Sequence, residues 1–236
     1  MIIYCFLSGL LFAQPEEVKK LIAGMHERYS ECKSFSAKLK MYLLDGNGGT
    51  VTEATGKVYI SDDLYFSRFD QKLLWINTRE MLNVDLNHQI FYYKKHTEKV
   101  KTLRQTAGVD IQSAMDSLKE NMHRYKFNLK KDNAGDYELE VSFPPGNPEN
   151  ITRQVLVLDK GYRLKTIHYH YKKNDAMGEI RGVRIDYTGY MFNKHPQWEE
   201  LNRSYFVKKS GKQTVPSERY KEFEFINAES YQDGKY

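Results

Sequence analysis

The chain has 236 residues, of which 40% are hydrophobic and 28% charged, and its formal net charge is +5. This length and balance suit one large domain with a buried core, and they exclude a chain that is disordered or membrane-embedded as a whole. The 18 tyrosines and 12 phenylalanines favour strands with one dry and one hydrated face, because a tyrosine ring packs while its hydroxyl stays wet. Lysines and arginines alternate with apolar residues along the predicted strands. The small net positive charge therefore indicates a solvated sheet face.

Residues 1–13 form a short apolar leader that ends at Ala13. A helix of that length spans about 20 Å, which is too short for a bilayer core of about 30 Å. The segment therefore predicts a signal peptide cleaved after Ala13, although its start carries no Lys or Arg. Cleavage would remove Cys5 and leave Cys32 alone, so no internal disulfide is expected. The expected product is exported, soluble and not membrane-spanning.

The spacing of apolar residues predicts a helix over residues 15–31. Pro15 suits the first helical turn, and Glu16 and Glu17 complement the positive helix N-terminus. Several apolar side chains recur with helical spacing and form one stripe, which we expect to pack on the sheet. These residues are Val18, Leu21, Ile22, Met25, Tyr29 and Cys32.

Residues 35–103 alternate between apolar and polar side chains, which predicts a run of strands. In the first strand, Leu39 and Met41 face one side of the sheet, while Lys40 faces the other. Gly56 stands inside the second strand and indicates a bend or bulge, which would help the sheet to curve. The expected strands are residues 35–44, 50–61, 64–69, 72–78, 80–86, 89–95 and 100–103.

A second amphipathic helix is expected over residues 110–125. Asp110 is its N-cap, and Leu118 and Met122 belong to its apolar face. Strands then resume and continue almost to the end of the chain. They are expected at residues 126–130, 136–143, 153–159, 163–171, 179–190, 204–209 and 220–226.

One antiparallel sheet of about ten or eleven strands would twist and curl into a part-closed barrel. The expected fold is therefore α+β: a curved antiparallel β-sheet that forms an incomplete barrel, with helices covering its concave face. Residues 14–190 would form this half-barrel domain, and residues 191–236 a C-terminal extension with one or two further strands and a polar tail. If the helices fill the concave side incompletely, an apolar cavity remains for a lipid or an acyl chain.

The sequence contains no G-x-S-x-G, H-E-x-x-H, C-x-x-C or Walker loop. His168 and His170 share one strand face and could meet one metal ion, but a site needs a third ligand, and the alternative is two exposed histidines on the polar side. The adjacent carboxylates of Asp62 and Asp63 on a turn are expected to face water. We therefore predict no enzymatic activity, no catalytic residue, no metal and no cofactor.

Short motifs follow the first helix in a set order: a Phe-x-Ala strand start at residues 35–37, a Gly-led aromatic strand at 56–60, an aromatic strand at 64–66 and an aromatic cluster at 90–93. In this order they resemble the bacterial outer-membrane lipoprotein carrier superfamily, the LolA/LolB-like fold. The resemblance covers roughly residues 15–190, and it identifies the chain as a divergent member. The order of the motifs carries more weight than any single motif.

The resemblance implies a periplasmic carrier that holds a lipid or an acylated lipoprotein, and it allows an envelope membrane protein as a further partner. Phe66 matches an aromatic residue that lines the family's cavity. Asp62 and Asp63 stand where the carriers typically have Arg-Pro, and that Arg is associated with ligand handling, so the transfer mechanism is not implied at this position.

The leading hypothesis is a non-enzymatic carrier that holds acyl chains between the concave sheet face and the helices. Two alternatives stay open: an RseB-like envelope sensor or scaffold that binds a protein, and a hydrolase or metal enzyme built on His168 and His170. Nucleic acid is not an expected partner. The expected cavity-lining residues are Leu39, Met41, Val58, Ile60, Phe66, Leu118 and Met122.

Overall fold

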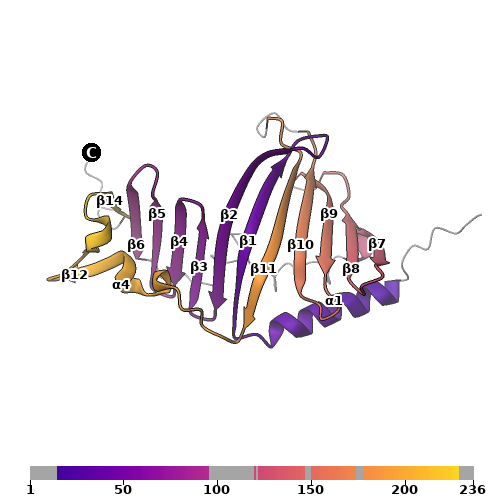
Figure 1. Ribbon diagram of the computed structural model, residues 1–236, viewed down its shortest axis with the longest axis horizontal. Coiled ribbons are helices and arrows are strands. Elements are labelled where there is room, and N and C mark those ends of the chain that lie inside the picture. Colours follow the sequence, from indigo (N-terminus) through magenta and orange to yellow (C-terminus); the bar gives the residue numbers. More distant parts are fainter. Residues whose placement is uncertain (1–14, 96–119, 121, 147–149, 174–177, 229–236) are drawn as a thin grey trace, which may run out of the picture.

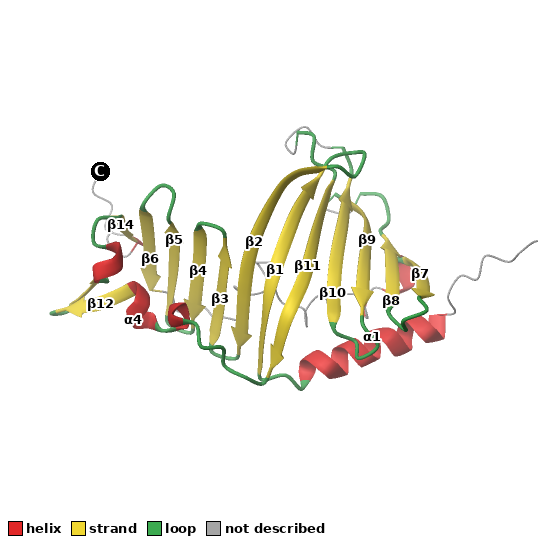
Figure 2. Ribbon diagram, in the orientation of Figure 1, coloured by secondary structure: helices red, strands yellow, loops and turns green. Residues whose placement is uncertain are grey.

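The computed structural model describes residues 15–95, 120, 122–146, 150–173 and 178–228, which form one large sheet, a separate hairpin, one long helix and several short helical segments (Figures 1 and 2). The helices are α1 (Pro15–Ser30) and α4 (Arg203–Phe206), with 3-10 turns η1 (Met122–Arg124), η3 (Glu199–Leu201) and η4 (Glu218–Tyr220). The strands are β1 (Ser34–Leu44), β2 (Thr50–Ser61), β3 (Leu64–Phe69), β4 (Lys72–Asn77), β5 (Glu80–Asp85), β6 (Ile90–Lys95), β7 (Lys126–Lys131), β8 (Tyr137–Ser142), β9 (Ile151–Leu158), β10 (Leu164–Tyr171), β11 (Gly182–Phe192), β12 (Val207–Ser210), β13 (Gln213–Pro216) and β14 (Glu224–Asn227).

The large sheet has 12 strands in the order β14-β6-β5-β4-β3-β2-β1-β11-β10-β9-β8-β7 and is not closed. Its neighbours are antiparallel, except that β14 runs parallel to β6. The pairing of β11 with β1 joins the β1–β6 meander to the β7–β11 meander (Figure 1). The prediction of an open, curved, antiparallel sheet with few helices is confirmed. In the described parts of the chain, no helix is long and apolar enough to cross a membrane.

α1 packs against one face of the β7–β10 part of the sheet, and we call this side of the whole sheet the α1 face. The predicted apolar stripe of α1 is buried, from Val18 to Tyr29, and the Tyr29 hydroxyl accepts a hydrogen bond from the Leu164 backbone N–H at 3.1 Å. A Cβ on Gly24 would lie 2.7 Å from the Tyr162 ring, so the helix approaches the sheet closely where it has no side chain. The sheet residues buried beneath α1 include Leu139, Val141, Leu156, Leu158 and Leu164.

The opposite face of the β2–β6 half carries a second apolar core. Residues 198–220, which we call the C-terminal cover, pack on this face through η3, α4, β12 and η4 (Figure 1). The Phe206 and Tyr220 rings stack with centroids 6.1 Å apart and are almost fully buried. The Trp75 indole N–H donates to the Leu201 carbonyl at 3.2 Å. The buried sheet residues of this core are Tyr59, Phe66, Leu73, Trp75, Leu82, Val84, Phe91 and Tyr93.

Ion pairs also join the C-terminal cover to the sheet. Glu200 accepts hydrogen bonds from Lys57 Nζ at 2.9 Å and Arg68 Nη1 at 3.4 Å. Burial opposes the ionisation of Glu200, but the Lys57 hydrogen bond, a backbone N–H and the two positive charges outweigh it and lower the pKa of this carboxyl. Arg203 forms a bidentate pair with Glu80, in which Nη2 lies 3.1 Å from Oε2. The charges buried on this face are therefore matched.

The C-terminal extension differs in detail from its predicted strands. The chain expected as a strand from residue 204 is helical as α4 and becomes extended only at Val207. Tyr220 lies in η4, and the last strand begins at Glu224. The leader at residues 1–13, the strand at 100–103 and the predicted helix before residue 120 lie outside the described residues.

Position 56 requires glycine because β3 approaches it closely. The glycine is not part of a bulge, since Gly56 stays in register with Leu39 and Phe69. A Cβ at this position would lie 2.5 Å from the Arg68 carbonyl oxygen. Since that atom belongs to the backbone, we expect Gly56→Ala to lower the free energy of unfolding by about 1 to 3 kcal/mol in urea denaturation. Gly161→Ala is the control, because its Cβ would meet only Asp159 Oδ1 at 3.4 Å. Equal stability of the two variants would contradict the prediction.

Candidate ligand-binding face

The predicted lining residues of the first two strands meet on the α1 face. Val58 pairs with Ala37, and Gly56 pairs with Leu39, so the alternation of both strands places Val58, Ile60 and Leu39 on one side. Leu39 and Val58 are buried, and Ile60 packs against them half-buried. Met41 is half-buried and follows on the same side of β1, opposite Ile185.

The second predicted helix contributes one described residue to this face. Met122 lies in η1, and its side chain packs half-buried against the same apolar core. Leu118, the other predicted lining residue of that segment, lies outside the described residues.

Phe66 does not share this face, and the prediction that it lines the same surface is wrong. Phe66 pairs with Tyr59 and Trp75, is fully buried in the second core, and its ring centroid lies 6.3 Å from that of Trp198. The adjacent Tyr65 faces the α1 core instead. Both residues are aromatic, so residue type does not distinguish them. Both faces of β3 are buried, because the C-terminal cover packs on the face opposite the α1 core. The sequence of β3 alone does not reveal this cover.

An aromatic row from β11 extends the α1 face, and the sequence reasoning missed it. The Tyr190 ring lies 6.5 Å from the Tyr187 ring and 6.1 Å from the Phe192 ring, stacked on both. Phe35 of β1 contacts the Phe192 ring at 5.5 Å, and Tyr29 of α1 contacts it at 5.8 Å. The row therefore links α1 to the middle of the sheet.

The polar groups of this row are phenol hydroxyls, and the exposed Arg28 lies at its end with its guanidinium 4.3 Å from the centroid of the Phe192 ring. Burial raises the pKa of Tyr29 to about 12, even though the hydrogen bond from Leu164 opposes the shift. Burial also raises the pKa of Tyr187 and of Tyr190 far above the ordinary value for tyrosine. These hydroxyls are protonated at every physiological pH, so they can donate hydrogen bonds but carry no charge.

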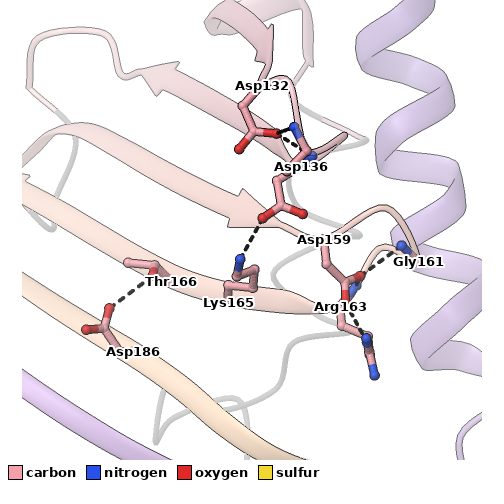
Figure 3. A network of polar contacts seen from close by, with 9 residues as sticks. Asp132, Asp136, Asp159, Gly161, Arg163, Lys165, Thr166 and Asp186 are labelled. Carbon is pink, nitrogen blue, oxygen red and sulfur yellow. Dashed lines mark hydrogen bonds and ion pairs between the residues drawn. The ribbon is translucent and has the colours of Figure 1, made fainter.

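The charges at the α1 end of the sheet are paired with one another along the strand ends (Figure 3). Asp159 accepts hydrogen bonds from the Gly161 and Arg163 backbone N–H groups and from the Arg163 side chain, whose Nε lies 2.6 Å away. Burial opposes the ionisation of Asp159, but these hydrogen bonds prevail and lower its pKa. Lys165 donates to Asp136 at 2.6 Å, which raises the lysine pKa. Asp159 and Asp136 are therefore each paired with a basic side chain at this end of the sheet.

His168 and His170 lie side by side on the face opposite α1, with ring centroids 3.8 Å apart. Burial, the neighbouring imidazole and Arg153 lower the pKa of His170 to about 4, and burial with Arg153 and Arg184 lowers the pKa of His168. Arg153 Nη2 lies 2.9 Å from His170 Nε2, so the guanidinium occupies the lone pair that a metal would need. Within the described residues, no group of three or more His, Cys, Asp or Glu side chains could hold a metal ion.

No family model and no curated protein matches the chain. Among solved structures, the chain is similar to an uncharacterised conserved protein from Thermus thermophilus, with 9% identity over 89% of this chain and 99% of that chain and a TM-score of 0.45. It is also similar to lipoprotein LppX of Mycobacterium tuberculosis, with 9% identity over 76% and 98% and a TM-score of 0.39. A LolA superfamily protein from Nitrosomonas europaea matches with 9% identity over 79% and 98% and a TM-score of 0.31.

Proposed function

We propose that this protein is an exported, non-enzymatic carrier or binding protein that holds a lipid, a lipoprotein acyl chain or a similar hydrophobic ligand against the α1 face. The observation that supports the proposal is the difference between the two faces of the sheet. The apolar side chains of the second core are sealed by the C-terminal cover, as the fully buried Phe66 and Leu82 show. Around the second core, Leu64 alone among the half-buried apolar residues belongs to β2–β6, and the others lie in the loops, the C-terminal cover or β14. The α1 face instead keeps half-buried apolar side chains on the strands themselves and on η1: Ile60, Phe69, Leu74, Met81, Met122, Ile185 and Tyr187.

The chemistry of this set suits an acyl chain. Met81 and Met122 have flexible, polarisable side chains that adapt to ligands of different shape. Each methylene that leaves water for such a surface contributes about 0.8 kcal/mol, so a long acyl chain gains affinity without any specific contact. Leu39 and Val58 form the buried floor beneath the half-buried residues.

The experiment compares two charge substitutions at neighbouring positions of β1. Met41 and Tyr42 are both half-buried, but Met41 lies on the α1 face, whereas the Tyr42 ring lies on the opposite face between Lys40 and Arg184. We expect Met41→Glu to weaken uptake of a fluorescent fatty-acid ester by about tenfold or more, because the ligand would bury against a carboxylate. Tyr42→Glu adds the same charge and is expected to leave uptake unchanged.

Mass spectrometry of the purified protein gives the second readout, since a carrier is expected to retain lipid from its host. Absence of lipid, together with no uptake of the fluorescent ester or the corresponding fatty acid, would rule out the carrier function. Lipid-independent capture of an envelope membrane protein would then support the sensor or scaffold alternative.

A further inference from the structure

A β-bulge directs Tyr190 onto the α1 face. Between the pairs Ser36–Met191 and Lys38–Thr188, β1 has one residue and β11 has two. Gly189 supplies the extra residue with a φ of +60°, a conformation that glycine adopts readily. Because of this bulge, Tyr187 and Tyr190 stack on one face although they stand three positions apart in the sequence.

The Tyr190 hydroxyl has no hydrogen-bond partner. Its oxygen is buried and forms no hydrogen bond with any described group. The nearby Tyr29 hydroxyl accepts from the Leu164 N–H and keeps its own proton free for donation. A buried, unpaired donor is unfavourable unless something completes its hydrogen bond. Ser36 Oγ and the Tyr93 hydroxyl are also unpaired, but both lie on the opposite face, so among these three groups the Tyr190 hydroxyl alone lies on the α1 face.

The buried polar groups of the two faces differ in charge. Both buried carboxylates, Glu80 and Glu200, lie on the opposite face, and both are paired with basic side chains of that face or of the cover. On the α1 face, the buried polar residues of the described chain are Ser67 and Gln154, which are uncharged. Neither residue offers a counter-charge to an ionised ligand group, and burying an unpaired charge is costly. The Arg28 guanidinium lies 4.3 Å from the centroid of the Phe192 ring, but Arg28 is exposed, so it offers a positive charge at the edge of the row and not within the buried surface.

We propose that the polar part of the ligand on the α1 face is an uncharged hydrogen-bond acceptor, such as an ester or amide carbonyl, and that the Tyr190 hydroxyl donates to it. The inference rests on the proposed function, because it names the class of lipid that the same face would select. An ester lipid can bury its carbonyl oxygen against this hydroxyl. An ionised fatty acid must leave its carboxylate at the rim or lose affinity.

The test uses two probes that differ only in charge: a fluorescent fatty acid and its methyl ester, both at pH 8, where the acid is ionised. We expect the protein to bind the ester at least tenfold more tightly than the acid. Tyr190→Phe is expected to weaken ester binding about fivefold, the effect of one neutral hydrogen bond, and to leave acid binding unchanged. Tyr92→Phe is the control, because it removes the hydroxyl of a half-buried tyrosine on β6, far along the sheet.

A thermal melt without ligand provides a readout independent of binding. Because Phe keeps the ring and removes an unpaired buried hydroxyl, Tyr190→Phe is expected to keep or raise the Tm. A lowered Tm would show that the hydroxyl has a partner within the protein and would overturn the inference. Equal affinity for ester and acid, or equal loss of both in Tyr190→Phe, would overturn it while leaving the carrier function intact. Binding of neither probe would overturn the carrier function and the inference together.

Discussion

Replacing Phe206 by alanine is expected to lower the free energy of unfolding by about 3 to 5 kcal/mol, the range for emptying a buried aromatic site. Phe206 is fully buried at the centre of the C-terminal cover. Its ring centroid lies 6.1 Å from that of Tyr220, 6.3 Å from that of Trp75 and 6.5 Å from that of Phe91. The cavity would be walled by rigid rings and strand backbone, so it could not collapse to recover the lost contacts.

Urea denaturation followed by tryptophan fluorescence measures this loss. The chain has 2 tryptophans, Trp75 and Trp198, and both lie in or against the second core, so the signal reports on the cover. Phe225→Ala on the edge strand β14 is the control, because Phe225 is only half-buried and its removal leaves a more open site. If Phe206→Ala lowered the free energy of unfolding no more than Phe225→Ala, the C-terminal cover would not enclose a core.

Removing the Arg203 side chain is expected to destabilise the protein, because the Glu80 carboxylate would stay buried without its partner. Glu80 keeps only 9% of its side-chain surface exposed, and Arg203 is its bidentate partner. Arg203→Met leaves this carboxylate buried and unpaired, which we expect to cost about 2 to 4 kcal/mol in urea denaturation. The value is below that of a fully buried pair because the Arg203 side chain is 34% exposed and water reaches it.

The double variant separates the pair's own contribution from the cost of an unpaired charge. Glu80→Leu combined with Arg203→Met removes both charges, and replacing a buried ion pair by apolar residues is often neutral. We therefore expect the double variant to recover most of the stability that Arg203→Met loses. A double variant as unstable as the single one would show that Arg203 acts through its packing on the cover and not through the charge of Glu80.

Local periodicity was sufficient to predict α1 and most strands of the large sheet. The apolar stripe of α1 and the alternation of β1 and β2 are properties of a few successive residues, and the predicted bounds of the second strand, residues 50–61, are those of β2. The same alternation placed Leu39, Met41, Val58 and Ile60 on one face. No long-range information was needed, because side-chain direction in a helix or strand follows from the backbone alone.

The alternation of apolar and polar residues along a strand could not show which faces of the sheet would be buried. Trp75 is buried by a hydrogen bond and packing from Leu201, which stands 126 positions away along the chain. Without that cover, a strand such as β3 presents one aromatic residue to each side, and Phe66 is as plausible a lining residue as Tyr65. The error at Phe66 therefore arose from a contact between distant parts of the chain.

Neighbouring residues in the chain are enough to specify α1, most strands of the large sheet and the class of sheet, because each of these depends on local spacing. Three further features required the folded molecule: residues 198–220 seal one face, Gly189 shifts the register of β11, and Tyr190 stacks on Tyr187 and Phe192 on the other face. These features depend on which strands pair and which segments pack across the sheet. They arise only when the whole chain has folded, because burial and counter-charge are properties of the assembled surface and not of any short segment.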